Sequence, residues 1–175
     1  MKQALIEDIG DGDLTAALVP EAQTARASIL CREPAVICGI PWFDRCFHEV
    51  DPSIQIEWLV AEGDHVPANQ ALCYLSGKAR ALLTAERCAL NFLQMLSGTA
   101  TATRRYVYAI AGTGSSILDT RKTLPGHRLA QKYAVTVGGG LNQRIGLYDG
   151  ILIKENHIAA AGGIPQVLAA AGALH

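Results

Sequence analysis

The sequence changes its pattern at Lys78, and this change constrains the fold more than any other feature. Residues 1–78 hold short apolar or alternating runs separated by glycines and prolines, which is typical of strands joined by turns. Residues 79–96 contain no glycine or proline, and their apolar residues recur at helical spacing. We therefore predict a small, mainly β or α+β region followed by a long helical connection.

The first region is expected to contain four strands and one helix. The predicted strands are Ala27–Leu30, Ala35–Cys38, Ile54–Val60 and Ala71–Leu75, and the predicted helix is Pro41–Val50. In the second region Ser97-Gly98 is expected to end the first helix, and Thr99–Ala111 to form another. The remaining predicted elements are a strand at Ile117–Leu118, a helix at Leu129–Tyr133, a strand or turn at Val135–Gly140, a strand at Gly150–Lys154 and a helix at Ile164–Leu174. Strands that alternate with helices indicate a parallel α/β sheet or barrel.

Three blocks late in the chain combine apolar, extended-looking residues with cations or glycines. They are Leu118–Gly126, Gly138–Arg144 and Ile151–His157. Cations where strands are predicted to end, beside glycines that let a backbone come close, suit a ligand with several negative charges. The four cations are Arg121, Lys122, Arg144 and Lys154.

The charge is distributed unevenly behind a net charge of −1. Residues 1–85 carry six Lys or Arg and twelve Asp or Glu, whereas residues 86–175 carry nine and four. The basic half can concentrate an anionic substrate, and the two halves can attract each other across a domain or subunit contact. Nucleic-acid binding is disfavoured because the cations are widely spaced and few aromatic residues lie among them.

Composition indicates a cytoplasmic protein that does not enter a membrane. No apolar run reaches the length of a membrane span, and the first residues lack the core of a signal peptide. The cysteines are odd in number and lack CxxC spacing, so we expect reduced, mostly buried thiols. They are Cys31, Cys38, Cys46, Cys73 and Cys88.

Five blocks, in order along nearly the whole chain, resemble the quinolinate phosphoribosyltransferase family, also called nicotinate-nucleotide pyrophosphorylase (carboxylating). The blocks are Glu7–Thr15, the pair of stretches Glu86–Gln94 and Leu96–Thr101, which resemble the family's helix, Asp119–Gly126, Gly138–Arg144 and Leu152–His157. The resemblance implies an open α/β sandwich over residues 1–110, including the connecting helices. It implies that residues 111–175 are the first part of a parallel α/β barrel that carries the substrate cations. The expected fold class is therefore α/β, with an α+β N-terminal domain and a partial barrel.

The resemblance also implies an activity. Quinolinate and phosphoribosyl pyrophosphate, with Mg²⁺, would give nicotinate mononucleotide, pyrophosphate and CO₂ in NAD biosynthesis, on a homodimer. Arg121 and Arg144 resemble the arginines that hold the quinolinate carboxylates, and Arg87 resembles one that serves the neighbouring subunit. Lys122 and Lys154 resemble catalytic lysines near the sugar phosphate. No metal ligand is assigned.

The chemistry favours such residues independently of the resemblance. Guanidinium groups bind a planar dicarboxylate in bidentate fashion and never lose their charge. Loss of pyrophosphate leaves an oxocarbenium-like sugar, so positioning and electrostatics should supply most of the rate.

The sequence departs from the family's pattern in two places. Gln143 stands where the family usually has a histidine, and glutamine can donate a hydrogen bond but cannot become charged. The chain also stops at His175, before the part of the family that supplies acidic residues near the ribose and the metal. We therefore expect the 175-residue form to bind quinolinate but not to turn over alone.

Two other interpretations stay open. The first alternative is a sister enzyme of this fold that acts on another anion. The second is a non-catalytic binding module derived from the fold. Three local features also have a structural interpretation. Arg104 and Arg105 are expected to be solvated, His157 to orient backbone, and the glycine run 138–140 to form either a turn or a phosphate cradle.

Overall fold

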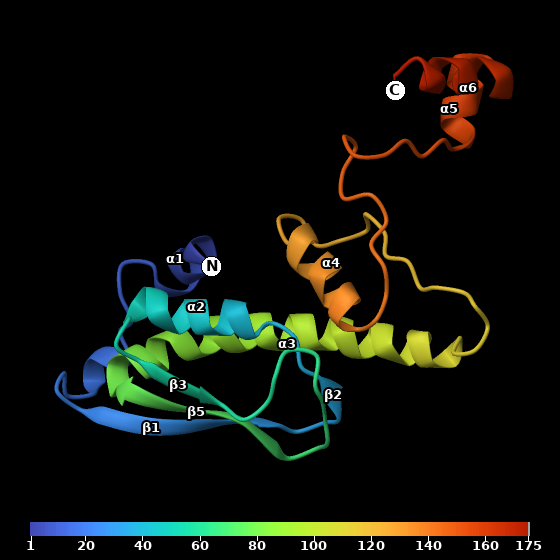
Figure 1. The fold of residues 1–175 in the computed structure, drawn as a ribbon. Coiled ribbons are helices and arrows are strands. Elements are labelled where there is room, and N and C mark those ends of the chain that lie inside the picture. The colour runs from blue at the N-terminus through green and yellow to red at the C-terminus, as the bar shows by residue number, and fades with distance from the viewer. Residues whose placement is uncertain (175) are drawn as a thin grey trace.

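The computed structural model describes residues 1–174 and shows a mixed α/β fold (Figure 1). The elements, in chain order, are α1 (Lys2–Ile9), the 3-10 turn η1 (Ala16–Leu18), β1 (Thr24–Cys31), β2 (Ala35–Val36), α2 (Ile40–Val50), β3 (Gln55–Trp58), β4 (His65–Val66), β5 (Gln70–Lys78), α3 (Ala79–Ala109), α4 (Arg128–Val137), α5 (Glu155–Ala161) and α6 (Ile164–Gly172). No helix in this described part is long and apolar enough to cross a bilayer.

The N-terminal region is built on an antiparallel sheet of three strands in the order β1-β5-β3, with a separate pair formed by β2 and β4. Helices α2 and α3 cover one face of the three-stranded sheet and leave the other face open (Figure 1). Side chains alternate along β5, so that Cys73 and Leu75 are buried while Tyr74 is exposed. The four strands and the helix predicted for this region are all present, with shifted ends.

The core of this region lies between the sheet and the two helices. Phe43 and Phe47 of α2 are fully buried, and the Phe43 ring lies 4.9 Å from that of Phe47 and 5.1 Å from that of Trp58. Aromatic pairs at this separation add to the stabilisation that burial alone provides. Helix α3 closes the core with Leu82, Ala85, Phe92 and Leu93, among others.

The cysteines agree with the prediction of free, mostly buried thiols. Cys31 is partly buried and the other four are buried. Burial raises the pKa of Cys46 to about 12, and the Sγ atoms of Cys46 and Cys88 lie 3.6 Å apart. Because the thiolate is the reactive form, this buried thiol is poorly reactive at neutral pH.

Helix α3 continues through Ser97 and Gly98, so the predicted break there is wrong. The Ser97 hydroxyl oxygen accepts a hydrogen bond from the backbone N–H of Cys38 at 2.9 Å and donates to the Cys38 carbonyl at 3.1 Å. Thr101 accepts one from the N–H of Val36 at 2.8 Å. These hydroxyls fasten α3 to the segment around β2, and their partners lie far away in the sequence.

Helix α4 packs on the second half of α3, where Ala130 and Ala134 are buried against Leu96 and Ala100. The helix predicted at Leu129–Tyr133 is thus present and longer. The glycine run that follows α4 is a tightly packed turn, because a Cβ on Gly138 would lie only 2.6 Å from the Ala100 carbonyl oxygen. This packing favours the turn interpretation.

The predicted strands of the second region are largely absent from the described residues. Ile117–Leu118 contributes one parallel bridge, between Leu118 and Leu141. The strand predicted at Gly150–Lys154 is wrong: this segment has no strand assignment, because no strand lies beside it. Helices α5 and α6 pack on each other and stand apart from the rest of the fold (Figure 1).

Candidate functional site

The parallel bridge brings two of the cationic blocks side by side. The N–H of Asp119 donates to the Leu141 carbonyl at 3.1 Å, and the N–H of Leu141 donates to the Ile117 carbonyl at 2.8 Å. Arg121 and Arg144 each lie three residues beyond a bridged leucine. Since the two segments are parallel, both arginines lie at their carboxyl edge, where α/β proteins commonly place functional groups.

Both arginines have a buried nitrogen without a partner. The Nε atoms of Arg121 and Arg144 are buried and lack a hydrogen-bond partner among the described residues. The Arg144 Nη1 donates to the Gly150 carbonyl at 3.0 Å, which fixes that guanidinium. An unsatisfied buried donor is unfavourable, so two such donors at one edge indicate a place for an acceptor of negative charge.

The loops that carry these arginines are tied together by Arg128, which the sequence did not single out. Its Nε donates to the Thr123 hydroxyl at 3.1 Å, and its Nη1 donates to the Ile145 carbonyl at 3.2 Å. Lys122 lies in the first loop with an exposed side chain, and its N–H donates to the Thr120 hydroxyl at 3.0 Å. Arg128, in the first turn of α4, therefore contacts both loops.

A buried ion pair lies beneath the same edge. Lys132 Nζ is 2.6 Å from Asp119 Oδ1, and the two side chains are 2% and 4% exposed. The same Nζ donates to the Gln143 carbonyl at 2.9 Å. Sequence analysis missed this pair, although Lys132 is the one cation in the helix predicted at Leu129–Tyr133 and Asp119 opens the block Asp119–Gly126.

The turn after Arg144 is held by Asp149. Its carboxylate accepts hydrogen bonds from the N–H groups of Ile145 at 2.7 Å and Gly146 at 2.8 Å. These donors hold the pKa of Asp149 below its ordinary value. Gln143, just before Arg144, has an exposed side chain, and its N–H donates to Asp119 Oδ1 at 2.8 Å.

The structure does not bring Arg87 or Lys154 to this edge. Arg87 is exposed on the first third of α3, about 25 Å along the helix axis from Arg104. Lys154 precedes α5, which stands apart from α4 (Figure 1). The N–H of Lys154 donates to His157 Nδ1 at 3.0 Å, which confirms that His157 orients backbone.

Arg104 is not a solvated residue as predicted. Its Nε and Nη2 donate to the carbonyls of Gly138 and Val137 at 2.9 and 3.0 Å, so it caps the C-terminal end of α4. Arg105, its neighbour, is exposed as expected.

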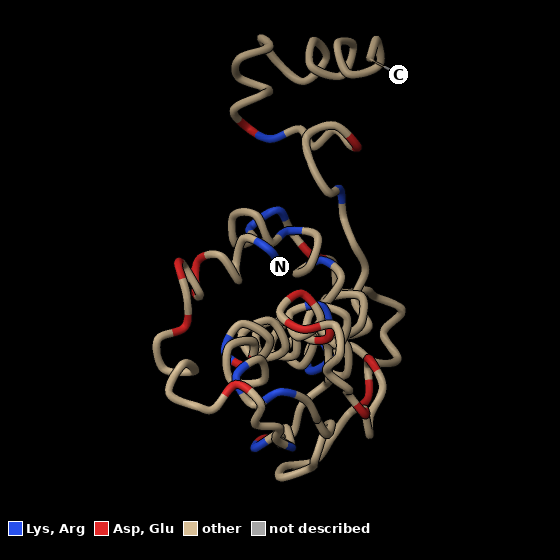
Figure 2. The backbone as a smooth tube through the Cα atoms, turned by 90° about the vertical axis from the view of Figure 1, so that its left-hand side faces the viewer, with Lys and Arg blue, Asp and Glu red and all other residues tan. Residues whose placement is uncertain are grey.

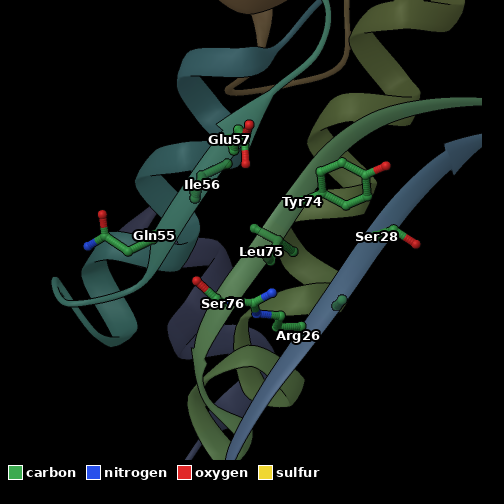
Figure 3. A pocket seen from close by; sticks show the side chains of 9 residues that line it. Arg26, Ser28, Gln55, Ile56, Glu57, Tyr74, Leu75 and Ser76 are labelled. Carbon is green, nitrogen blue, oxygen red and sulfur yellow. The ribbon is translucent and has the colours of Figure 1, made fainter.

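Two other parts of the described surface carry none of the predicted site residues. After Glu155 the described chain carries no Lys, Arg, Asp or Glu, so the tube is uniformly tan towards the C-terminal end (Figure 2). The open face of the sheet has a shallow hollow lined by one cation, Arg26, one anion, Glu57, and neutral side chains including Tyr74 (Figure 3). None of the predicted site residues lines that hollow.

A sandwich domain joined through one helix to parallel strand pairing, with an arginine pair at the carboxyl edge, defines the chain as a two-part α/β protein. Family models give the finer assignment. The quinolinate phosphoribosyl transferase N-terminal domain matches residues 13–97, and the C-terminal domain of the same family matches residues 99–174. The chain belongs to this family, which confirms the resemblance and the predicted fold class.

Individual relatives agree with the family assignment. The chain is 45% identical over 167 residues to quinolinate phosphoribosyltransferase [decarboxylating] 1 of Nicotiana glauca, covering 94% of this chain and 47% of the relative. It is 42% identical over 168 residues to a probable nicotinate-nucleotide pyrophosphorylase [carboxylating] of Synechocystis, covering 96% and 57%. The chain spans about half the length of the curated relatives it matches.

Solved structures share the fold. The nicotinate-nucleotide pyrophosphorylase of Francisella tularensis superposes with a TM-score of 0.95 at 48% identity, over 99% of this chain and 61% of that one. NadC of Streptococcus pyogenes gives a TM-score of 0.94 at 40% identity, over 99% and 62%.

Proposed function

We propose that this protein is a pentosyltransferase that moves the phosphoribosyl group of phosphoribosyl pyrophosphate to quinolinate, with decarboxylation to nicotinate mononucleotide. Relatives over 40% identical carry the corresponding name. The observation that carries the proposal is the pair of buried, unpartnered Nε atoms on Arg121 and Arg144 at one edge. Quinolinate presents two adjacent carboxylates, which match two guanidinium groups in charge and hydrogen-bonding capacity.

The proposed roles rest on the family resemblance and on charge. Arg121 and Arg144 bind the carboxylates, and Gln143 donates a further hydrogen bond from a side chain that cannot carry charge. Lys122 and Lys154 act near the sugar phosphate, where an ammonium group stabilises the departing pyrophosphate. In this proposal Lys154 reaches the site only once its segment lies against the carboxyl edge.

Magnesium belongs to this proposal as part of the substrate. No group of three or more His, Cys, Asp or Glu that could hold a metal occurs within residues 1–174. Mg²⁺ is commonly bound through substrate phosphates together with few protein oxygens. It would therefore arrive with phosphoribosyl pyrophosphate and neutralise the leaving group.

The homodimer and the cytoplasmic location are further parts of the proposal. Arg87 is exposed and distant along α3 from the α4 contact, which suits a residue that serves a second subunit's site. The acidic first half and basic second half favour a two-fold contact. Five free cysteines fit a reducing compartment.

Calorimetric titration with quinolinate tests the proposal, with unrelated dianions as competitors. Arg144→Lys should weaken binding by roughly 1.5–3 kcal/mol, because an ammonium cannot replace the guanidinium fork. Arg105→Lys, on an exposed neighbouring surface, should leave the affinity unchanged. Equal quinolinate affinity in the wild type and Arg144→Lys, or equal binding of any dianion, would refute the assignment of this site.

The residue at position 143 offers a second test. Gln143→His should tighten quinolinate binding more at pH 6 than at pH 8, because histidine gains its charge below about pH 6.5. The wild type should show no such difference between the two pH values. Equal affinity of the variant at both would exclude a direct contact from this position.

A further inference from the structure

We propose that the buried Lys132–Asp119 ion pair is a positioning device that holds Arg121 and Arg144 in register. The ligand in this proposal rests on the proposed function, whereas the geometry does not. Neither residue was predicted for the site, and neither is proposed to touch the substrate.

The contacts form one connected network. Lys132 Nζ bonds to Asp119 Oδ1 at 2.6 Å and to the Gln143 carbonyl at 2.9 Å. Asp119 Oδ1 in turn accepts the N–H of Gln143 at 2.8 Å. With its amide turned to satisfy both neighbours, Asn142 donates to Asp119 Oδ2 at 2.7 Å and to the Lys132 carbonyl at 3.0 Å.

The network acts directly on the two arginine-bearing segments. Asp119 precedes Arg121 by two residues, and Gln143 immediately precedes Arg144. A single ammonium group therefore joins the two segments at the point where they pass beyond the Leu118–Leu141 bridge. In a wide parallel sheet, hydrogen bonds to neighbouring strands would hold these segments. Among the described residues the segments share one parallel bridge, so side-chain contacts must supply the rest of the support.

Burial makes the arrangement specific. Removing one partner of a buried ion pair destabilises the protein, because the remaining charge is left uncompensated in a medium of low dielectric. Replacing both partners by neutral residues is often tolerated. Stability and positioning can therefore be separated by mutation. Lys132→Met leaves Asp119 unpaired, and Lys132→Met with Asp119→Asn removes both charges but keeps an acceptor for the Gln143 N–H.

The first measurement is hydrogen exchange, which needs no ligand. In the double variant, thermal stability should return towards that of the wild type. Exchange at the backbone amides of residues 141–145 should still be faster by about tenfold, the factor expected for one charge-assisted hydrogen bond. Amides of β5 serve as internal reference. Lys2→Met is the matched control, since the Lys2 side chain is 76% exposed in its pair with Glu49.

The second measurement is quinolinate titration of the same proteins. A positioning role predicts about tenfold weaker binding in the double variant, despite its recovered stability. Affinity and exchange that recover together with stability would overturn the inference. If wild-type protein does not bind quinolinate, the proposed function fails, and the exchange measurement alone decides the role of the ion pair.

Discussion

The two regions of the molecule reach order by different means. The N-terminal region buries large apolar side chains, such as Phe43, Phe47 and Ile54, in a shared core. The described chain after Ile110 buries only small residues and one lysine, which are Ala130, Lys132, Ala134, Gly138, Gly140 and Gly146. Leucines of that region, such as Leu141 and Leu147, are 53% and 75% exposed.

The difference shows which interactions fix the positions of backbone and side chains in each region. Close packing of large side chains fixes the sandwich domain, since any change of volume is felt by its neighbours. The segment that carries Arg121 and Arg144 is fixed instead by directional polar contacts from Arg128, Lys132 and Asp149. Predictions about the two regions should therefore differ in kind.

The largest contrast is expected between two truncations. Phe47→Ala removes a fully buried ring and should lower the free energy of unfolding by about 3–5 kcal/mol. Leu147→Ala should change it by less than about 0.5 kcal/mol, because this leucine is 75% exposed. Denaturant unfolding followed by fluorescence of Trp42 and Trp58 measures both. Similar losses in the two variants would show that the second region shares a core with the first.

Two glycine substitutions, one at the contact between α3 and α4 and one away from it, test how tightly the two regions are packed together. Gly138→Ala should destabilise by about 2 kcal/mol, because its Cβ would lie 2.6 Å from both the Ala100 carbonyl oxygen and Thr103 Cβ. Gly98→Ala, in open space on α3, should stabilise by about 0.5–1 kcal/mol. Melting temperatures report both changes. A neutral Gly138→Ala would mean that α4 is free to move off α3.

Neighbouring arginines give a smaller, sharper comparison. Arg104→Ala removes two hydrogen bonds and a cation from the C-terminal end of α4, so it should cost roughly 1 kcal/mol. Arg105→Ala should be neutral because Arg105 is exposed. The Trp42 ring lies 5.3 Å from that of Tyr133, so its fluorescence reports whether α4 stays docked. An equal loss of stability in Arg104→Ala and Arg105→Ala would contradict the capping role of Arg104.

The smallest expected effect is a local pH dependence at Asp149. Its pKa is lowered by the N–H donors of Ile145 and Gly146, so the turn is stabilised above the ordinary carboxyl pKa. That stabilisation is lost as the pH falls through the lowered value. NMR of the two amides, followed from pH 6 downward until the Asp149 carboxyl is protonated, should show the loss at a pH below the ordinary carboxyl value, and Asp149→Asn should abolish it. A wild-type turn that keeps its amide shifts throughout would contradict this assignment.

The sequence predicted correctly those helices and strands that are determined by residues near to them in the chain. Pro41 and the apolar residues after it were sufficient for α2. The expectation that Arg121 and Arg144 bind one ligand agrees with their place beyond the Leu118–Leu141 bridge and stays a prediction. The break at Ser97 was predicted wrongly because its hydroxyl is satisfied by Cys38, which is remote in the sequence. The strand at Gly150–Lys154 was wrong because a strand requires a neighbour that the segment alone cannot provide.

The partners of the site's supporting residues could not be predicted from the sequence, for the same reason. Asp119 lies in the block Asp119–Gly126, but no motif indicates which residue it pairs with, and Lys132 and Arg128 lie in no motif. Their roles depend on the packing of α4 against the second half of α3, which brings separate segments together. Spacing identifies residues that face a ligand more readily than residues that hold those residues in place.

The uninterrupted α3 has a mechanical consequence. The two family models meet at residues 97 and 99, in the middle of this helix, where a flexible hinge would otherwise be expected. At 1.5 Å per residue, α3 is a rod of about 45 Å that belongs to both parts. The sandwich domain and the α4 segment therefore cannot swing independently, because rotation of one end of the rod would turn the other. A recombinant exchange of domains between relatives would have to splice this helix in phase, since one inserted residue would rotate Arg104 by about 100° away from α4.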